Sequence, residues 1–346
     1  MNVRKRTLAE LPAVYAVGTI DLPGGTHYVA ASEGREACLL FAPPDWTVST
    51  VWDVPGGAMN VVPVPGRAGT ILAIQGFFPV FDSEGAGIVY ATAGADPTRP
   101  WRVQRVVDLP FVHRIDVVEV DHVPYVVAAT LCGGKTFKDD WSQPGAVYVA
   151  AVPRKPDDPW YLEKVLDGIG RNHGMTVAAV EGERAVLVAG REGLFRLRIP
   201  DIPGQRWSSV CLIEREISDV ALFDLDGDGE PEIVAIEPFH GDRLVVYDLV
   251  QGAWRPVSAT AVDFGHVVWA GSLFGRPSII AGSRGGAKDL VLLQPEGCDL
   301  EGARRIVLDE GVGPTQVVVR EQDEGVHVMS ANHGAGEVAL YEISHS

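Results

Sequence analysis

Histidines dominate the chemistry that this sequence can offer, because five of its nine lie in short polar motifs between apolar runs. They are His113, His173, His240, His266 and His333. Imidazole titrates near neutral pH, so a group of histidines can supply a general base, a general acid or ligands for a divalent metal. The alternative is that each histidine satisfies backbone groups of its own turn, as His and Asn often do.

Cationic and aromatic side chains accompany the histidines. Arg114, Arg191, Arg284, Lys135 and Lys138 could hold anionic or enolate oxygens. The longest loop, Gly133–Gly145, adds Asp140 and Trp141, and the loop Gln75–Gly87 adds Phe77, Phe78 and Phe81. Aromatic rims with charged partners suit a carbohydrate, although such loops can also be flaps that touch no ligand. We predict that the residues binding substrate are Lys138, Asp140, Trp141, Arg191, Arg284 and Phe78.

A separate acidic motif begins at Asp224. Carboxylates follow one another at positions 1, 3, 5 and 9, with Gly at position 6, which is the spacing that wraps oxygen ligands around a hard cation. It is not an EF-hand, because position 12 is Ala235. We expect a structural calcium or magnesium site, or else an Asp/Gly turn without metal. The expected ligands are the side chains of Asp224, Asp226, Asp228 and Glu232 and the carbonyl of Glu230.

Five tryptophans show how these residues are positioned. Trp46, Trp101, Trp160, Trp207 and Trp254 recur about every 47 to 59 residues, each at the start of a β-like run. A period near 50 residues with four short runs per unit is typical of propeller blades. The sequence therefore predicts an all-β protein, a single seven-bladed β-propeller over residues 1–346. The predicted blades are 11–56, 57–110, 111–168, 169–215, 216–260, 261–310 and 311–346.

The seventh unit contains only three runs, whereas the N-terminus carries an unpaired one. Its sequence from Val3 to Pro12, VRKRTLAELP, is close to WRVQRVVDLP at Trp101–Pro110. We therefore predict that residues 3–10 supply the fourth strand of the last blade. This closes the ring and leaves no exposed central edge.

The blade pattern places the histidines at one mouth of the central channel. In an antiparallel meander, the start of the first strand and the end of the second lie at the same end of the sheet. First strands are predicted to begin around His113, His173 and His266, and second strands to end near His240 and His333. Five separate blades would thus contribute imidazoles to one face.

Composition excludes several partners. The formal net charge of −17 argues against nucleic acid and anionic membrane surfaces, which bind basic proteins. No run approaches the length of a membrane span or signal peptide, so we expect a cytoplasmic protein. Oligomerisation is open.

Two resemblances follow from these motifs. The acidic loop within a blade resembles FG-GAP or VCBS repeats of β-propellers. His113-Arg114-Ile115, the run from Leu131 to Gly145, Asn172-His173-Gly174 and the run from Glu237 to Asp242 resemble the propeller part of aldos-2-ulose dehydratase/isomerase, the family of 1,5-anhydro-D-fructose dehydratase. This similarity covers about half of the chain. The resemblance implies that the protein removes water from an anhydro-keto-sugar. The fungal enzyme of this family also carries cupin domains after its propeller, and the resemblance does not extend to their activity.

The leading hypothesis is a carbon–oxygen lyase, a dehydratase that acts on a keto-sugar or anhydro-sugar by histidine-mediated β-elimination. His113 or His173 would be the base, Arg114 and Lys135 would face the carbonyl oxygen, and His240 or His266 would be the acid. In a variant, several histidines bind a second divalent metal that polarises the carbonyl. The alternatives are a polysaccharide lyase, a sugar isomerase, or a non-catalytic propeller that binds carbohydrate or protein.

Overall fold

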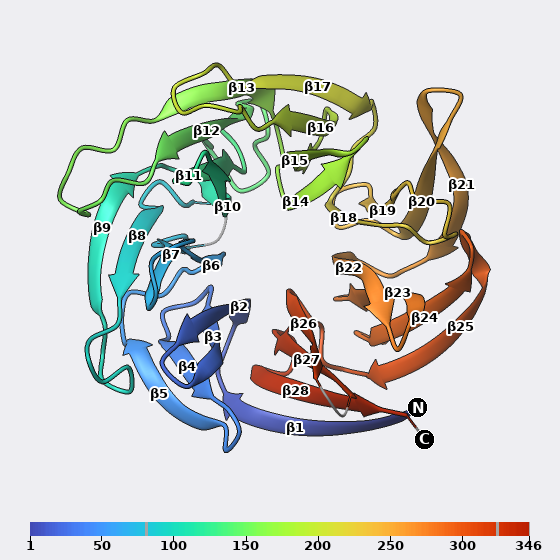
Figure 1. The fold of residues 1–346 in the computed structure, drawn as a ribbon, viewed down its shortest axis with the longest axis horizontal. Coiled ribbons are helices and arrows are strands. Elements are labelled where there is room, and N and C mark those ends of the chain that lie inside the picture. Colours follow the sequence, from blue (N-terminus) through green and yellow to red (C-terminus); the bar gives the residue numbers. More distant parts are fainter. Residues whose placement is uncertain (80–81, 323–324, 346) are drawn as a thin grey trace.

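The computed structural model describes residues 1–79, 82–322 and 325–345. These residues form seven four-stranded antiparallel sheets arranged around a central channel (Figure 1). In each sheet the first strand lies nearest the channel and the fourth lies at the perimeter (Figure 1). The predicted seven-bladed β-propeller is confirmed. Within the described chain, no helix is long and apolar enough to cross a membrane.

The strands follow one another along the chain within each blade. Blade 1 contains β2 (Val14–Leu22), β3 (Gly25–Ser32), β4 (Cys38–Ala42) and β5 (Thr47–Trp52). Blade 2 contains β6 (Val61–Pro63), β7 (Thr70–Gln75), β8 (Gly87–Thr92) and β9 (Arg102–Asp108). Blade 3 contains β10 (Val112–Val120), β11 (Val123–Thr130), β12 (Gly145–Ala151) and β13 (Glu163–Ile169). Blade 4 contains β14 (Met175–Val180), β15 (Glu183–Gly190), β16 (Gly193–Arg198) and β17 (Ser208–Ile213).

The remaining blades keep this order until the ring closes. Blade 5 contains β18 (Asp219–Phe223), β19 (Glu232–Glu237), β20 (Arg243–Val250) and β21 (Ala253–Ala261). Blade 6 contains β22 (Gly265–Leu273), β23 (Arg276–Ser283), β24 (Leu290–Glu296) and β25 (Asp299–Asp309). Blade 7 contains β26 (Val317–Gln322), β27 (Gly325–Asn332), β28 (Glu337–Ser344) and, as its outer strand, β1 (Asn2–Glu10).

Each tryptophan of the repeat lies at the start of an outer strand and faces the preceding blade. Trp101, just before β9, packs among side chains of blades 1 and 2, and Trp207, just before β17, packs between blades 3 and 4. The seven hydrophobic clusters of the described residues are each built mainly from two neighbouring blades. Burial is therefore divided around the ring, which is how a long chain can fold without one large core.

The N-terminal strand closes the ring as the sequence predicted. β1 pairs with β28 from Asn2↔Ser344 to Glu10↔Glu337, with one irregularity after Thr7. The two chain ends consequently lie side by side at the perimeter (Figure 1). The Lys5 ammonium adds ion pairs to Asp309 at 2.7 Å and to Glu337 at 2.5 Å.

Removing residues 1–10 should leave the edge of β28 unpaired and destabilise the whole ring. Because each net backbone hydrogen bond contributes about 1 kcal/mol, we expect a loss on the order of 5 kcal/mol in the free energy of unfolding. Denaturant unfolding of the truncated chain measures this loss. A synthetic peptide of residues 1–10, added in trans, should restore part of it. Unchanged stability after truncation would contradict closure by β1.

Candidate functional site

The site begins with a turn that recurs at the inner end of the blades. A residue with positive φ stands two positions before the first channel-facing residue in six of the seven blades. The pairs are Ala13 and Tyr15, Gly57 and Met59, Phe111 and His113, Arg171 and His173, Phe264 and His266, and Gly313 and Thr315. In blades 1, 3 and 6 the second member of the pair is also the extra residue of a β-bulge. Bulges of this kind redirect a side chain out of the regular pleat.

The repeated turn places Tyr15, His113, His173 and His266 around one point. The Tyr15 hydroxyl oxygen lies 3.4 Å from Nε2 of His113, 3.2 Å from Nε2 of His173 and 3.5 Å from Nε2 of His266. Nε2 of His173 lies 3.3 Å from Nε2 of His266. Four side chains from blades 1, 3, 4 and 6 therefore converge although they are widely separated in sequence.

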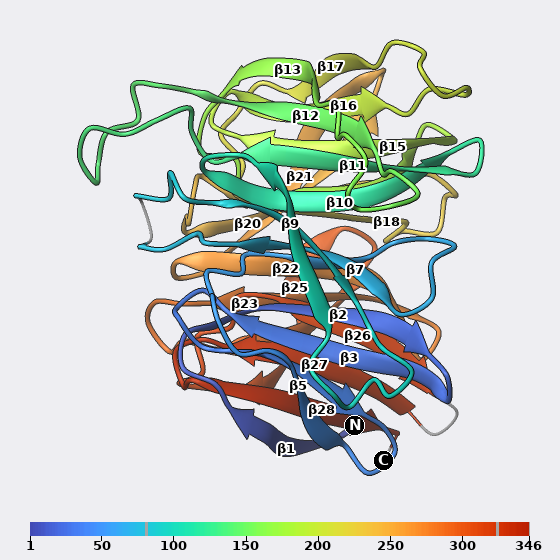
Figure 2. The ribbon, with the colours of Figure 1, turned by 90° about the vertical axis from the view of Figure 1, so that its left-hand side faces the viewer.

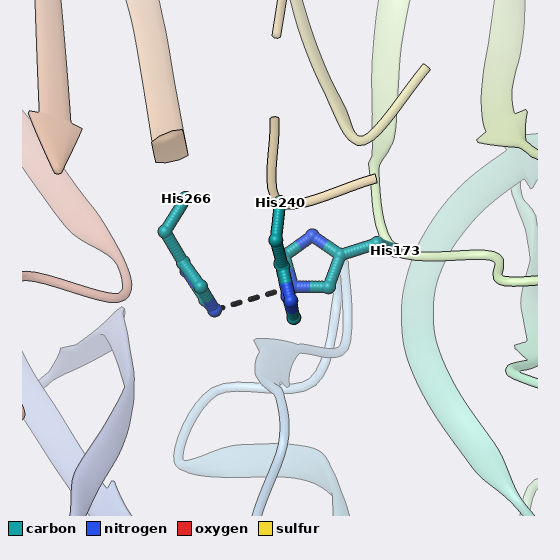
Figure 3. A group of neighbouring side chains, drawn as sticks. All are labelled: His173, His240 and His266. Atoms are coloured by element: carbon teal, nitrogen blue, oxygen red, sulfur yellow. Dashed lines mark hydrogen bonds between the residues drawn. The ribbon is translucent and has the colours of Figure 1, made fainter. Parts of the chain in front are cut away.

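His240 joins this group from the end of the second strand of blade 5. Its backbone N–H donates to the Ser218 hydroxyl at 3.1 Å. Ser218 directly precedes β18, the first strand of the same blade. The His240 ring stacks on Phe239 and lies 5.1 Å from the His266 ring between centroids. Figure 3 shows His173, His240 and His266 pointing toward a common centre. One ring nitrogen of each lies within 4.8 Å of the others, so the three can hold a metal ion.

A hydrogen bond fixes the orientation of the His266 ring. His266 Nδ1 lies 3.1 Å from the Thr315 carbonyl, which can only accept, so Nδ1 carries the proton and the Nε2 lone pair faces the cluster. The Asn172 amide donates to the Ala189 carbonyl at 2.7 Å beside His173. Gly174 is required at the next position, because a Cβ there would lie 2.8 Å from Asp219 Cα.

The imidazoles are neutral at physiological pH. Burial, with the nearby Arg114 and the other histidines, holds the pKa values of His113, His173 and His266 well below the usual range. Burial, followed by Arg284 and Arg114, lowers the pKa of His240 to about 3. Burial also raises the pKa of Tyr15 to about 12. Neutral imidazoles are the form that binds metals.

The cluster opens into a cavity of about 360 Å³. Aromatic rings of Phe77, Phe239 and Phe264 form much of its wall, and Glu33 and Arg284 supply its charged groups. A volume of this size lies at the lower end of the roughly 300–1,000 Å³ typical of small-molecule sites. The cavity therefore suits a ligand no larger than a monosaccharide.

The cavity's charged rim comes from residues that follow second strands. Glu33 follows β3, Arg284 follows β23 and His333 follows β27. Arg284 donates to His333 Nδ1 at 2.9 Å, and His333 Nε2 lies 2.6 Å from the Glu33 carboxylate. His333 thus lies outside the group formed by the other four histidines of the predicted mouth. It contacts two residues that line the cavity, Arg284 and Glu33.

Other predicted site residues lie outside the lining of the cavity. Arg114 is buried beneath Tyr15, 5.6 Å from its ring centroid, and donates to the Met59 carbonyl at 3.1 Å. There it lines a second cavity of 460 Å³ that continues the channel, together with Asp116 and Asp219. Burial raises the pKa of each of these two carboxyl groups to about 6. Arg191 is exposed after β15.

The loop between β11 and β12 extends from one side of the disc (Figure 2). Within it, Lys135 lies 3.3 Å from the centroid of Trp141 and donates to the carbonyls of Lys138 and Asp140. The Asp140 carboxylate accepts hydrogen bonds from Thr136 and Ser142. These residues stabilise the loop itself. One contact of the loop with the site is the edge-to-face packing of Trp141 on Phe239, with ring centroids 5.7 Å apart.

Of the two phenylalanines of the β7–β8 loop that the structure describes, Phe77 lines the cavity and Phe78 does not. Phe77 is buried in the cavity wall, 5.4 Å from the His113 ring between centroids. Phe78 is 41% exposed and packs under Arg35 instead. Phe81 lies outside the described residues.

The acidic loop joins β18 to β19, at the end of blade 5 opposite the histidines. Asp224, Asp226 and Asp228 present carboxylate oxygens within 4.8 Å of one another, and Asp226 also meets Glu232 and Cys298 at that distance. Asp224 accepts hydrogen bonds from the N–H groups of Gly227 and Gly229. Burial, with the neighbouring acidic residues, raises the pKa of Glu232 to about 7. Glu230 is exposed.

Sequence reasoning missed Tyr15, Glu33 and Ser218. A signal for Tyr15 was present, because Leu11-Pro-Ala-Val-Tyr15 has the same pattern as Leu109-Pro-Phe-Val-His113. In both, the N–H of the valine donates to the leucine carbonyl at 3.1 Å, which closes the turn. Extending the N-terminal repeat, Val3–Pro12, by three residues would have aligned Tyr15 with His113.

Comparisons with known proteins support the fold alone. No family model and no curated protein matches the sequence. Among solved structures, a gluconolactonase from Xanthomonas campestris is 11% identical with a TM-score of 0.50, covering 98% of this chain and 89% of its own. The PQQ-bound aldose sugar dehydrogenase of Streptomyces coelicolor is 16% identical with a TM-score of 0.50, covering 99% and 98%. Sqt1 of Saccharomyces cerevisiae is 10% identical with a TM-score of 0.58, covering 99% and 98%. The chain thus shares its fold with proteins of different kinds, and two of these three are sugar-processing enzymes by name.

The low pKa of His240 predicts how stability depends on pH. The unfolded chain binds a proton at this residue below about pH 6.5, whereas the folded chain does not until about pH 3. Stability is therefore lost as the pH falls below 6.5, by about 2 kcal/mol at pH 5 for this one residue. The variant His240→Gln should lose about 2 kcal/mol less than wild type between pH 7 and pH 5. Denaturant unfolding with a metal chelator present measures this difference.

The control is His345→Gln, because His345 is exposed in the C-terminal tail. It should keep the wild-type pH dependence. If His240→Gln and wild type lose stability equally between pH 7 and pH 5, His240 is not held neutral in the folded protein.

Proposed function

We propose that this protein is a metal-dependent carbon–oxygen lyase, a dehydratase acting on a keto-sugar or anhydro-sugar of monosaccharide size. The observation that carries the proposal is the convergence of neutral imidazole nitrogens on one point at the wall of a small cavity. Two imidazole nitrogens bound to one tetrahedral zinc ion at about 2.0–2.1 Å lie about 3.3 Å apart. That is the distance between Nε2 of His173 and Nε2 of His266.

The residues fit a divalent transition metal better than calcium. His173, His240 and His266 offer only nitrogen ligands, which suit zinc or iron. Nε2 of His240 is buried and has no hydrogen-bond partner among the described residues. The Thr315 carbonyl orients His266 as outer-sphere groups orient metal ligands. When bound, the metal would polarise the substrate carbonyl and acidify the neighbouring C–H group.

His113 and Tyr15 would then move the protons. Neutral His113 takes the proton from the carbon beside the carbonyl, and the electron pair of that C–H bond forms the new double bond. The C–O bond at the next carbon breaks, and the departing oxygen takes the Tyr15 proton and leaves as water. His113 Nε2 lies 3.4 Å from the Tyr15 oxygen, so the proton can return from one to the other and reset the site.

This assignment keeps one of the two bases expected from sequence and changes the acid. His113 remains the base, whereas Tyr15 replaces His240 or His266 because those two are assigned to the metal. Arg114 lies beneath Tyr15 and would steady the phenolate that forms in the reaction. Lys135, held in its own loop, has no assigned role.

The two structurally similar sugar enzymes support only the general class of substrate, which is a sugar. The gluconolactonase and the aldose sugar dehydrogenase act on sugars by their names, and their low identity transfers no reaction. A non-catalytic sugar-binding propeller is the second candidate, favoured by the three phenylalanines in the cavity wall. A sugar isomerase would use the same base without breaking the C–O bond. We propose also that the Asp224–Glu232 loop binds calcium as a structural ion.

Elimination would produce a conjugated enone, which absorbs in the ultraviolet. With 1,5-anhydrofructose and other keto-sugars, metal-loaded wild type should give rising absorbance. Tyr15→Phe and His113→Gln should each lower kcat by about 10²–10⁴-fold, because each removes one proton transfer. Tyr15→Phe should keep its metal, which separates loss of chemistry from loss of the site.

His345→Gln again serves as the control and should retain full activity. A chelator should abolish the activity, and zinc or iron should restore it. Sugar binding without any product, unaffected by His113→Gln, would favour the binding propeller. Isomerised product without absorbance would favour the isomerase.

A further inference from the structure

Arg284 is a positive charge in the cavity wall whose role the proposed reaction leaves open. It follows β23 directly, and its backbone N–H donates to the Phe264 carbonyl at 2.9 Å. Its guanidinium lies 5.8 Å from the centroid of the Phe264 ring, and both side chains line the cavity. The position of Arg284 is therefore set by its backbone hydrogen bond to Phe264 and by the face of the Phe264 ring.

No carboxylate of the described residues forms an ion pair with Arg284. The nearest acidic residue of the cavity, Glu33, is held by His333 at 2.6 Å instead. Arg284 donates to the other nitrogen of the same ring, His333 Nδ1, at 2.9 Å. His333 therefore contacts both charged side chains, one through each of its ring nitrogens.

The guanidinium retains donors for a ligand. Arginine carries five N–H groups in a planar fork, and the contact with His333 uses one side of it. Such a fork matches the oxygens of a carboxylate or a phosphate group, which it binds through two parallel hydrogen bonds. Arg284 also acts on the nearby imidazoles, since its charge contributes to lowering the pKa of His240 and His266.

The cavity is thus electrically unlike the protein around it. The chain has a net charge of −17, yet the cavity contains Arg284, with Arg114 directly beneath Tyr15. The one carboxylate that the described residues contribute to it, Glu33, already accepts from His333. A neutral sugar would leave this arginine without an anionic partner in a half-buried site, whereas an anionic sugar would supply one.

We propose that Arg284 binds an anionic group of the substrate, so that the substrate class is an acidic sugar carrying a carboxylate or a phosphate. The proposal rests on the proposed function, because it assumes that the cavity beside the histidines is the substrate site. It adds what sequence and comparisons leave open, namely the charge of the substrate. Glu33 and His333 are positioning residues that hold Arg284 toward the cavity.

Equilibrium binding tests this without requiring turnover. Calorimetry with D-glucose, D-glucuronate and D-glucose 6-phosphate compares a neutral, a carboxylated and a phosphorylated sugar of similar size. We expect one of the two anions to bind wild type at least 10-fold more tightly than glucose. The preferred anion identifies carboxylate or phosphate as the group that Arg284 recognises.

Variants assign the preference to this residue. Arg284→Gln should abolish the preference, and Arg284→Lys should retain part of it. Arg276→Gln is the matched control, because Arg276 is exposed at the opposite end of the same strand β23. It should bind all three sugars like wild type. Thermal unfolding of each variant checks that it is folded.

Equal binding of all three sugars by wild type, or a preference that survives in Arg284→Gln, would overturn the proposal. The two proposals fail separately. If the preference depends on Arg284 but no keto-sugar acid or phosphate gives an enone, the lyase is wrong and the anion site stands. If neutral keto-sugars are dehydrated while anions gain nothing, the lyase stands and the anion site is wrong.

Discussion

The site depends on the backbone turn that begins the inner strand of the blades. A left-handed residue followed two positions later by a channel-facing side chain occurs in six blades, and in three of them the channel-facing residue forms a bulge. Ala13, Phe111, Arg171 and Phe264 adopt positive φ without being glycine, which costs on the order of 1 kcal/mol or more each. Strain of this kind persists only where surrounding packing enforces it, and here the packing is that of a closed ring. The same turn that begins the inner strand of these six blades therefore aims one side chain from each toward the axis.

Burial then determines what these side chains can do. Four imidazoles close together in an apolar wall cannot all be charged, and the cations Arg114 and Arg284 oppose protonation further. A low pKa weakens a histidine as a base but keeps its lone pair available to a metal over a wide pH range. Tyr15 has the opposite shift, since burial keeps its proton in place. In the proposed reaction, neutral His113 and protonated Tyr15, 3.4 Å apart, would allow one site to remove and return a proton.

Much of the architecture could be predicted from the sequence. The tryptophan period was informative because an outer-strand Trp fills the space against the preceding blade, as Trp101 and Trp207 do. Antiparallel pairing then placed His113, His173, His240 and His266 at one mouth. Tyr15 was not predicted, because the predicted cluster was based on histidines. The turn before Tyr15 nevertheless has the same sequence pattern as the turn before His113. The Lys135 loop was harder to interpret, because sequence does not show that Asp140 accepts hydrogen bonds from Thr136 and Ser142 within the same loop.

The most direct test of the account is a spectroscopic titration of the metal-free protein with cobalt(II). Coordination by His173, His240 and His266 should give the intense visible bands of four- or five-coordinate cobalt at one equivalent per chain. His266→Gln should lose these bands, whereas Asp226→Asn, in the acidic loop of the opposite face, should keep them. Weak six-coordinate bands, or intense bands that disappear with Asp226→Asn and survive in His266→Gln, would show that the histidines do not form a metal centre.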